Sequence, residues 1–177
     1  MPAAVRSPDG REHHYAFEPK RMMRLYWTPE DFARAPEWTT NARIFEEVVA
    51  AARSRGVRLI FSWAPSAPHV VLPLLRGRVP AEQLRAFAAF DEDDLPPAPE
   101  FERELFARLD SVESVFREFC ARHGVEFVSP TRALRERMAA GVPVYFTYDQ
   151  HWTRLGHEVV AEVLAAHLAG AHPAARP

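Results

Sequence analysis

Residues 57–63 read Val57-Arg58-Leu59-Ile60-Phe61-Ser62-Trp63, an almost continuous apolar run of strand length. A strand with apolar residues on both faces is typical of a parallel sheet that helices cover on both sides. A helix is predicted just before it, over residues 41–55, because apolar residues recur there at helical spacing and Gly56 follows as a C-terminal cap. This neighbourhood therefore predicts an α/β fold.

The second half of the chain continues the alternation of helices and strands. A second apolar strand is predicted over residues 125–128, and apolar stripes predict helices over residues 69–75, 80–90, 100–123, 131–140 and 153–168. Such alternation implies parallel strands joined by crossover helices. Two strands alone leave exposed sheet edges, so the chain is predicted to be the second half of a doubly wound domain.

Helix caps and chain breakers indicate the domain boundaries. Several prolines and the Asp9-Gly10 pair predict an irregular N-terminal segment over residues 1–28. Thr28 then caps a short helix, and the domain is predicted to extend over residues 29–170. Residues 171–177 are predicted to be a frayed tail.

The composition narrows the function classes. The 177 residues are 47% hydrophobic and 26% charged with a net charge of -2, which is normal for a globular domain and leaves no basic surface for nucleic acid. No run reaches the ~18 apolar residues of a membrane span, and no signal peptide is visible, so a cytoplasmic location is the default expectation. Cys120 is the single cysteine and is expected to be buried rather than reactive. No cofactor is predicted.

A short motif near the C-terminus carries the chemistry. Asp149 precedes His151 by two residues, after a short extended piece and before the last predicted helix. A carboxylate that accepts a bond from one imidazole nitrogen leaves the other nitrogen free to take a proton from a hydroxyl nucleophile. The alternative interpretation of this spacing is a structural hydrogen bond near the start of a helix.

This part of the chain resembles the C-terminal signature of SGNH/GDSL-type hydrolases, since it reads Tyr145-Phe146…Asp149-Gln150-His151-Trp152-Thr153…Gly156-His157…Val160-Ala161. The resemblance is closest to a bacterial D-x-H-W branch related to polysaccharide O-acetyl-modifying enzymes. It implies a three-layer, Rossmann-like (flavodoxin-like) α/β fold and hydrolysis or transfer of an O-acyl group. By the same resemblance Asp149 and His151 are the acid and base of a Ser-His-Asp triad, and His157 packs against the helix entrance.

The chain departs from that family in its nucleophile and oxyanion hole. The family's serine lies in a Gly-Asp-Ser turn after the first strand, and these residues contain no such turn. Asn41, the only asparagine, opens a predicted helix rather than following a strand, and no serine follows His151. Ser66 lies in a turn beyond the first predicted strand and is the weak alternative nucleophile, because no neighbouring glycine permits a strained elbow.

Two function hypotheses follow. In the first, the chain is an SGNH-type esterase whose nucleophile segment is missing from these residues, acting on an O-acylated carbohydrate or another ester. The incomplete sheet would then self-associate or pair with the missing N-terminal half. In the second, the chain is a non-catalytic SGNH-like module that binds a carbohydrate or a partner.

A zinc site is a weaker alternative, formed by Asp149, His151 and His157 with His13 or His14. Two helix-borne ligands usually lie four residues apart, and His151 and His157 do not. No metal is therefore predicted.

Overall fold

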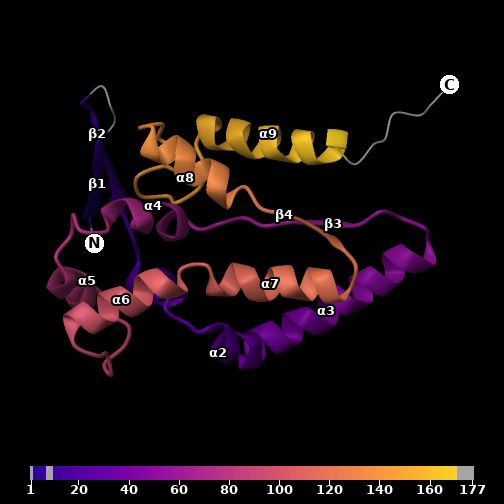
Figure 1. Cartoon of the computed structure of the whole chain (residues 1–177), viewed down its shortest axis with the longest axis horizontal. Helices are drawn as coiled ribbons and strands as arrows, with labels where there is room; N and C mark the ends of the chain where they lie inside the picture. Colours follow the sequence, from indigo (N-terminus) through magenta and orange to yellow (C-terminus); the bar gives the residue numbers. More distant parts are fainter. Residues whose placement is uncertain (1, 7–9, 171–177) are drawn as a thin grey trace. The chain divides into compact units, whose positions relative to one another are not determined.

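The computed structural model of the protein describes residues 2–6 and 10–170 (Figure 1). The chain divides into two compact units. The first unit contains residues 1–18, 64–79 and 128–177, and the second contains residues 19–63 and 80–127. The tail predicted over residues 171–177 lies outside the described residues. No helix in the described part of the chain has both the length and the hydrophobicity that crossing a bilayer requires.

The first unit combines a hairpin with three helices. Strands β1 (Pro2–Arg6) and β2 (Glu12–Ala16) pair in antiparallel register, with Val5 opposite His13 and Ala3 opposite Tyr15. The helices are α4 (Ala67–Leu75), α8 (Thr131–Ala139) and α9 (Arg154–Gly170). Helix α8 packs against both α4 and α9, and α4 also contacts β1, so four segments that are distant in the sequence share one core.

The prediction that residues 1–28 are irregular is wrong for most of this segment. Besides the hairpin, helix α1 (Pro19–Met23) forms there. Val5, Tyr15 and Met22 are buried, with at most 3% of each side chain exposed. Their burial stabilises a hairpin and a helix that the prolines and the two adjacent histidines obscure in the sequence, because the alternation of apolar residues is short and weak.

The second unit is mainly helical. Its helices are α1, α2 (Pro29–Arg34), α3 (Pro36–Ser54), α5 (Ala81–Ala88), α6 (Ala98–Arg108) and α7 (Ser111–Arg122). Strand β3 (Ile60–Ser62) lies beside β4 (Glu126–Val128), and the two are hydrogen-bonded neighbours (Figure 1). The mixed α/β class predicted from the sequence is confirmed, although β3 is shorter than the predicted strand.

An aromatic cluster forms the core of the second unit. Trp38 of α3 lies edge-on to Phe116 and Phe119 of α7, with ring centroids 5.9 and 5.8 Å apart. Phe61 of β3 meets Phe116 at 5.4 Å, so the strand and both helices contact one ring. Cys120 is fully buried in this cluster, and burial raises the pKa of its thiol to about 11. The expectation of a buried cysteine is confirmed.

Local signals predicted the helix ends well. Gly56 and Gly124 have φ angles of 64° and 57°, and each ends a helix in the left-handed conformation that glycine adopts without strain. After each glycine the next amide closes the last turn, Val57 N–H to Ala52 C=O and Val125 N–H to Cys120 C=O, both at 2.9 Å. These bonds turn the chain directly into β3 and β4.

The predicted long helix over residues 100–123 is two helices instead. It breaks between α6 and α7 at Leu109 and Asp110. Aspartate and serine compete with helical hydrogen bonds, and Asp110 stands directly before Ser111. The break lets α6 pack against α5 while α7 packs against α2.

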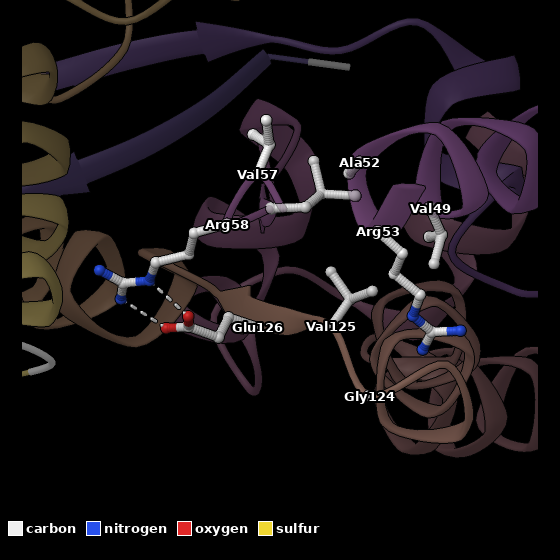
Figure 2. A pocket seen from close by; sticks show the side chains of 9 residues that line it. Val49, Ala52, Arg53, Val57, Arg58, Gly124, Val125 and Glu126 are labelled. Atoms are coloured by element: carbon white, nitrogen blue, oxygen red, sulfur yellow. Dashed lines mark hydrogen bonds and ion pairs between the residues drawn. The ribbon is translucent and has the colours of Figure 1, made fainter. Parts of the chain in front are cut away.

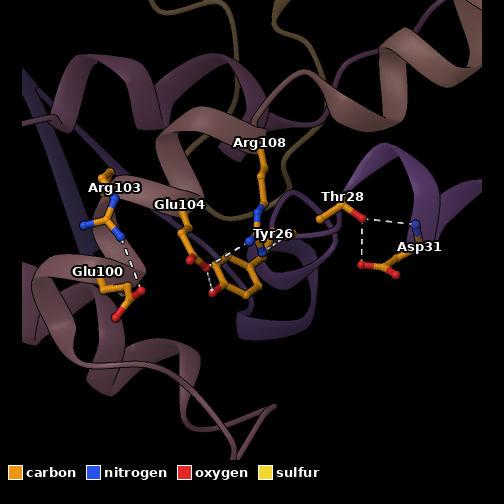
Figure 3. Close-up of polar contacts among 7 residues, drawn as sticks. All are labelled: Tyr26, Thr28, Asp31, Glu100, Arg103, Glu104 and Arg108. Atoms are coloured by element: carbon orange, nitrogen blue, oxygen red, sulfur yellow. Dashed lines mark hydrogen bonds and ion pairs between the residues drawn. The ribbon is translucent and has the colours of Figure 1, made fainter.

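A polar network joins Tyr26, in the segment before α2, to helix α6. The Tyr26 hydroxyl donates to Glu104, and Arg108 lies 3.0 Å from the same carboxylate while its guanidinium covers the Tyr26 ring (Figure 3). Arg108 also donates to the Tyr26 carbonyl at 3.1 Å. Burial and the Glu104 carboxylate together raise the pKa of Tyr26 to about 12.

A shallow groove of about 200 Å³ lies where the chain enters β3 and β4 (Figure 2). Arg58 and Glu126 form a bidentate ion pair at one side, with N–O distances of 2.6 and 2.8 Å. Val57 contributes an apolar side chain that is 57% exposed. Both charges are matched, so the groove offers a ligand no free ionic partner from this pair.

Candidate functional site

The candidate site is a tight loop at the start of α9, which we call the Asp–His loop (residues 145–152). Tyr145 and Trp152 form an antiparallel bridge at its base. The Phe146 N–H donates to the His151 carbonyl at 3.0 Å, and the Thr153 N–H donates to the Val144 carbonyl at 2.9 Å. Two backbone bonds thus close a six-residue turn that carries Asp149 and His151.

Thr153 and Gly156 join this loop to α9. The Thr153 hydroxyl donates to the Pro143 carbonyl at 2.7 Å and accepts from the Gly156 N–H at 3.2 Å, as an N-terminal cap does. A β-carbon at Gly156 would lie 2.2 Å from the carbonyl oxygen of Val144. The helix can therefore approach the segment at Val144 that precedes the loop only because position 156 has no side chain.

Asp149 and His151 are hydrogen-bonded, Asp149 Oδ1 to His151 Nδ1. A carboxylate can only accept, so the bond places the ring proton on Nδ1 and leaves Nε2 as an acceptor. Gln150, between them, has a φ angle of 61°, a left-handed conformation that costs a non-glycine residue about 1 kcal/mol. The side chains of Asp149 and His151 are 58% and 83% exposed.

Two hydrogen bonds fasten the loop to other parts of the first unit. The Tyr145 hydroxyl donates to the Pro65 carbonyl at 2.7 Å, and the Ala16 N–H of β2 donates to the Thr147 carbonyl at 3.0 Å. Tyr145 is buried, with 3% exposure, and this burial raises the pKa of its phenol. The loop is therefore held on two sides while Asp149 and His151 face solvent.

Trp152 and His157 pack together with perpendicular rings whose centroids are 5.5 Å apart. This contact gives His157 a packing role at the entrance of α9. Among residues 2–6 and 10–170, no third metal-ligating group accompanies Asp149 and His151. Asp149 and His151 are therefore a polar pair suited to proton transfer.

Ser66 is the residue before α4 and has an extended backbone. Its carbonyl accepts from Val70 at 3.3 Å, whereas its hydroxyl does not cap the helix. In the described part of the chain, no hydrogen bond joins Ser66 to His151. The structure thus brings Asp149 and His151 together and leaves Ser66 unjoined to them, although Pro65 beside it binds Tyr145.

Sequence reasoning missed the residues that support the pair. The Thr153-x-x-Gly156 spacing is a local signal of a capped helix start and could have indicated the role of Thr153. The bond between Tyr145 and Pro65 spans 80 residues and leaves no local signal. The supporting contacts therefore come from the tertiary structure.

A comparison with known families bears on the lineage of this site. The SGNH hydrolase-like domain of the acetyltransferase AlgX matches residues 25–177, which include the whole Asp–His loop and strands β3 and β4. The chain belongs to this SGNH hydrolase-like family. No curated protein and no solved structure matches the chain. The resemblance inferred from the D-x-H-W motif is thereby confirmed at the level of the family.

Proposed function

We propose that the chain supplies the acid–base pair of an O-acyl ester site, which hydrolyses or transfers acetyl groups on a polysaccharide by a Ser-His-Asp mechanism. The observation that carries the proposal is the hydrogen bond between Asp149 and His151, whose side chains are both exposed to solvent. Membership of the AlgX-type family supports acyl chemistry and a sugar substrate. The three-layer, Rossmann-like arrangement belongs to the same proposal, as does a domain over residues 29–170.

In the proposed reaction His151 Nε2 takes the proton from a serine hydroxyl as the oxygen attacks the acyl carbonyl. The tetrahedral intermediate collapses, the carbon–oxygen bond to the sugar breaks, and the imidazolium returns its proton to the leaving sugar oxygen. Water or an acceptor hydroxyl then attacks the acyl-serine with His151 again as base. The bond between the acyl carbon and the serine oxygen breaks, the imidazolium returns its proton to that oxygen, and the acid or the new ester is released. Asp149 holds the tautomer and stabilises the imidazolium throughout.

The serine of this scheme is proposed to come from outside residues 1–177, in a segment that precedes or follows them. Ser66 is the alternative within the chain, and its uncapped hydroxyl and its position beside Pro65 favour it over the other serines. The two sources differ experimentally, because only Ser66 would react in the present chain.

The test is covalent labelling with a fluorophosphonate, read by intact mass, on the present chain and on a chain extended along its reading frame in both directions. His151→Ala is compared with His14→Ala, which alters an exposed histidine of β2. An adduct on the extended chain that His151→Ala abolishes and His14→Ala preserves is the expected result. If every folded form stays unlabelled, or if labelling survives His151→Ala, the catalytic proposal fails.

A non-catalytic binding module is the second candidate, and one observation favours it. Phe146 and Tyr148 of the Asp–His loop are 49% and 82% exposed, so the loop presents two aromatic side chains that a ligand could cover. The affinity of the present chain for acetylated and for deacetylated polysaccharide tests this role, when it is measured for the wild type and for Tyr148→Ala. Binding that needs Tyr148 but is unchanged by His151→Ala would support it.

A further inference from the structure

Among the described residues, Tyr145 is the only residue of the Asp–His loop whose side chain hydrogen-bonds to another segment, since its hydroxyl donates to the Pro65 carbonyl. The hydroxyl lies in a buried environment, where a hydrogen bond is not exchanged for one to water and its loss leaves a carbonyl unpaired. Tyr145 is also the residue whose backbone bridges to Trp152, directly after His151. One residue thus links the loop base to the segment before α4.

We infer that Tyr145 is a positioning residue, whose hydroxyl keeps the Asp–His loop in the conformation that pairs Asp149 with His151. This inference rests on the proposed function for its catalytic meaning, but the pairing itself can be measured without any activity. It assigns to Tyr145 a role that neither the family match nor the D-x-H motif assigns to it.

The turn that carries the pair is strained, and the pair itself is exposed to solvent. Gln150 adopts a left-handed conformation, and His151 is 83% exposed, so packing around the pair itself contributes little to holding the turn. An exposed hydrogen bond of this kind is weak, because water competes for both partners. The conformation must therefore be imposed by the loop base, where Tyr145 is buried and bonded.

The Ala16–Thr147 bond holds the other side of the loop, but it cannot replace Tyr145. The Ala16–Thr147 bond holds only the Thr147 carbonyl. The Tyr145 hydroxyl instead holds one end of the Tyr145–Trp152 bridge, which sets the distance between the two ends of the turn. Removing the hydroxyl alone leaves the aromatic ring in place, so Tyr145→Phe tests the bond rather than the packing.

The experiment reads the imidazole tautomer of His151 by nitrogen-15 NMR in the full chain. Wild type should hold the ring proton on Nδ1, and Asp149→Asn should shift the ring toward the tautomer mixture of a free imidazole. Tyr145→Phe should shift it in the same direction. Tyr26→Phe is the matched control, since it also removes a tyrosine hydroxyl bond, in the second unit, and should leave the tautomer unchanged.

Several outcomes would overturn the inference. Tyr145→Phe with the wild-type tautomer would show that the hydroxyl does not position the pair. An equal shift in Tyr26→Phe would show that the effect is general loss of stability. A free-imidazole mixture in the wild type would show that no Asp149–His151 pair is held in solution, and this result refutes the inference whether or not Tyr145→Phe folds. Failure of fluorophosphonate labelling refutes the catalytic proposal and leaves these results intact.

Discussion

Gly156→Ala should destabilise the protein although the substitution lies in a helix, where alanine is normally the better residue. The new methyl group would lie 2.2 Å from the Val144 carbonyl oxygen and 3.0 Å from Cβ of Trp152. The carbonyl cannot move freely, because it accepts the Thr153 N–H at 2.9 Å and Val144 is fully buried. Helix α9 must therefore shift away from the segment at Val144 that leads into the Asp–His loop.

The magnitude follows from three contributions. Steric overlap with a fixed neighbour lowers the free energy of unfolding by about 3 kcal/mol, and loss of the Thr153–Val144 hydrogen bond lowers it by about 1 kcal/mol. The higher helix propensity of alanine raises it by about 1 kcal/mol. The free energy of unfolding should fall by about 3 kcal/mol, which lowers the melting temperature by about 6–12 °C in a chain of this size.

Thermal and urea unfolding followed by circular dichroism measure this change, with Gly170→Ala as the matched control. Gly170 also belongs to α9, but nothing lies within 4 Å of the place where its β-carbon would be. Gly170→Ala should leave the melting temperature almost unchanged. If Gly156→Ala is as stable as Gly170→Ala, the close approach of α9 to Val144 is not a feature of the folded protein.

Three further predictions concern other parts of the chain. Cys120 is fully buried, and the pKa of its thiol is about 11. It should resist a thiol-specific disulfide reagent at pH 8 in the folded protein and react with it after the protein is unfolded in denaturant. Burial raises the pKa of Tyr15 from 10.0 to about 12. The stability that the neutral phenol contributes is therefore complete below pH 10 and is lost as the pH rises toward 12. Urea unfolding measured across this pH range should show a smaller loss of stability in Tyr15→Phe than in the wild type. Val57→Ser, which removes a side chain 57% exposed at the groove, should lower hydrophobic dye binding and self-association in sedimentation experiments, and unchanged values would contradict an apolar contact surface there.

The sequence predicted those elements whose signals are local. Glycine after a helix and an apolar run before it were enough for the ends of α3 and α7, because the capping bonds join residues at most five positions apart. Thr28 is another case, since its hydroxyl accepts from the Asp31 N–H at 3.1 Å. Where one turn of chain contains all the partners, residue types and spacing are sufficient.

The errors arose where distant residues decide the conformation. The β1–β2 hairpin is stabilised by buried Val5 and Tyr15, and Tyr15 donates to the sulfur of Met138 at 3.6 Å, 123 residues away. The division of residues 98–122 into α6 and α7 lets the two helices pack against different partners, α5 and α2. Neither partner can be identified from a window of neighbouring residues.

The D-x-H spacing identified the two residues of the pair but not what holds them. Spacing cannot distinguish a supported pair from a chance contact on a flexible turn, because the difference lies in the Tyr145 hydroxyl and in the missing side chain at Gly156. Those contacts join the loop to Pro65 and let α9 lie against the Val144 carbonyl. The structure therefore adds the positioning of the pair, which is the property that proton transfer requires.

The exposure of His151 finally bears on how the proposed reaction could proceed. An imidazole that is 83% exposed is surrounded by water, which competes for Nε2 and weakens every electrostatic contribution to an acyl-transfer transition state. The segment that supplies the nucleophilic serine would therefore have to cover the Asp–His loop, including Phe146 and Tyr148. Labelling of the extended chain should consequently be accompanied by protection of the loop amides from hydrogen exchange, whereas labelling without protection would mean that the pair acts uncovered and that the exposed aromatic residues serve another purpose.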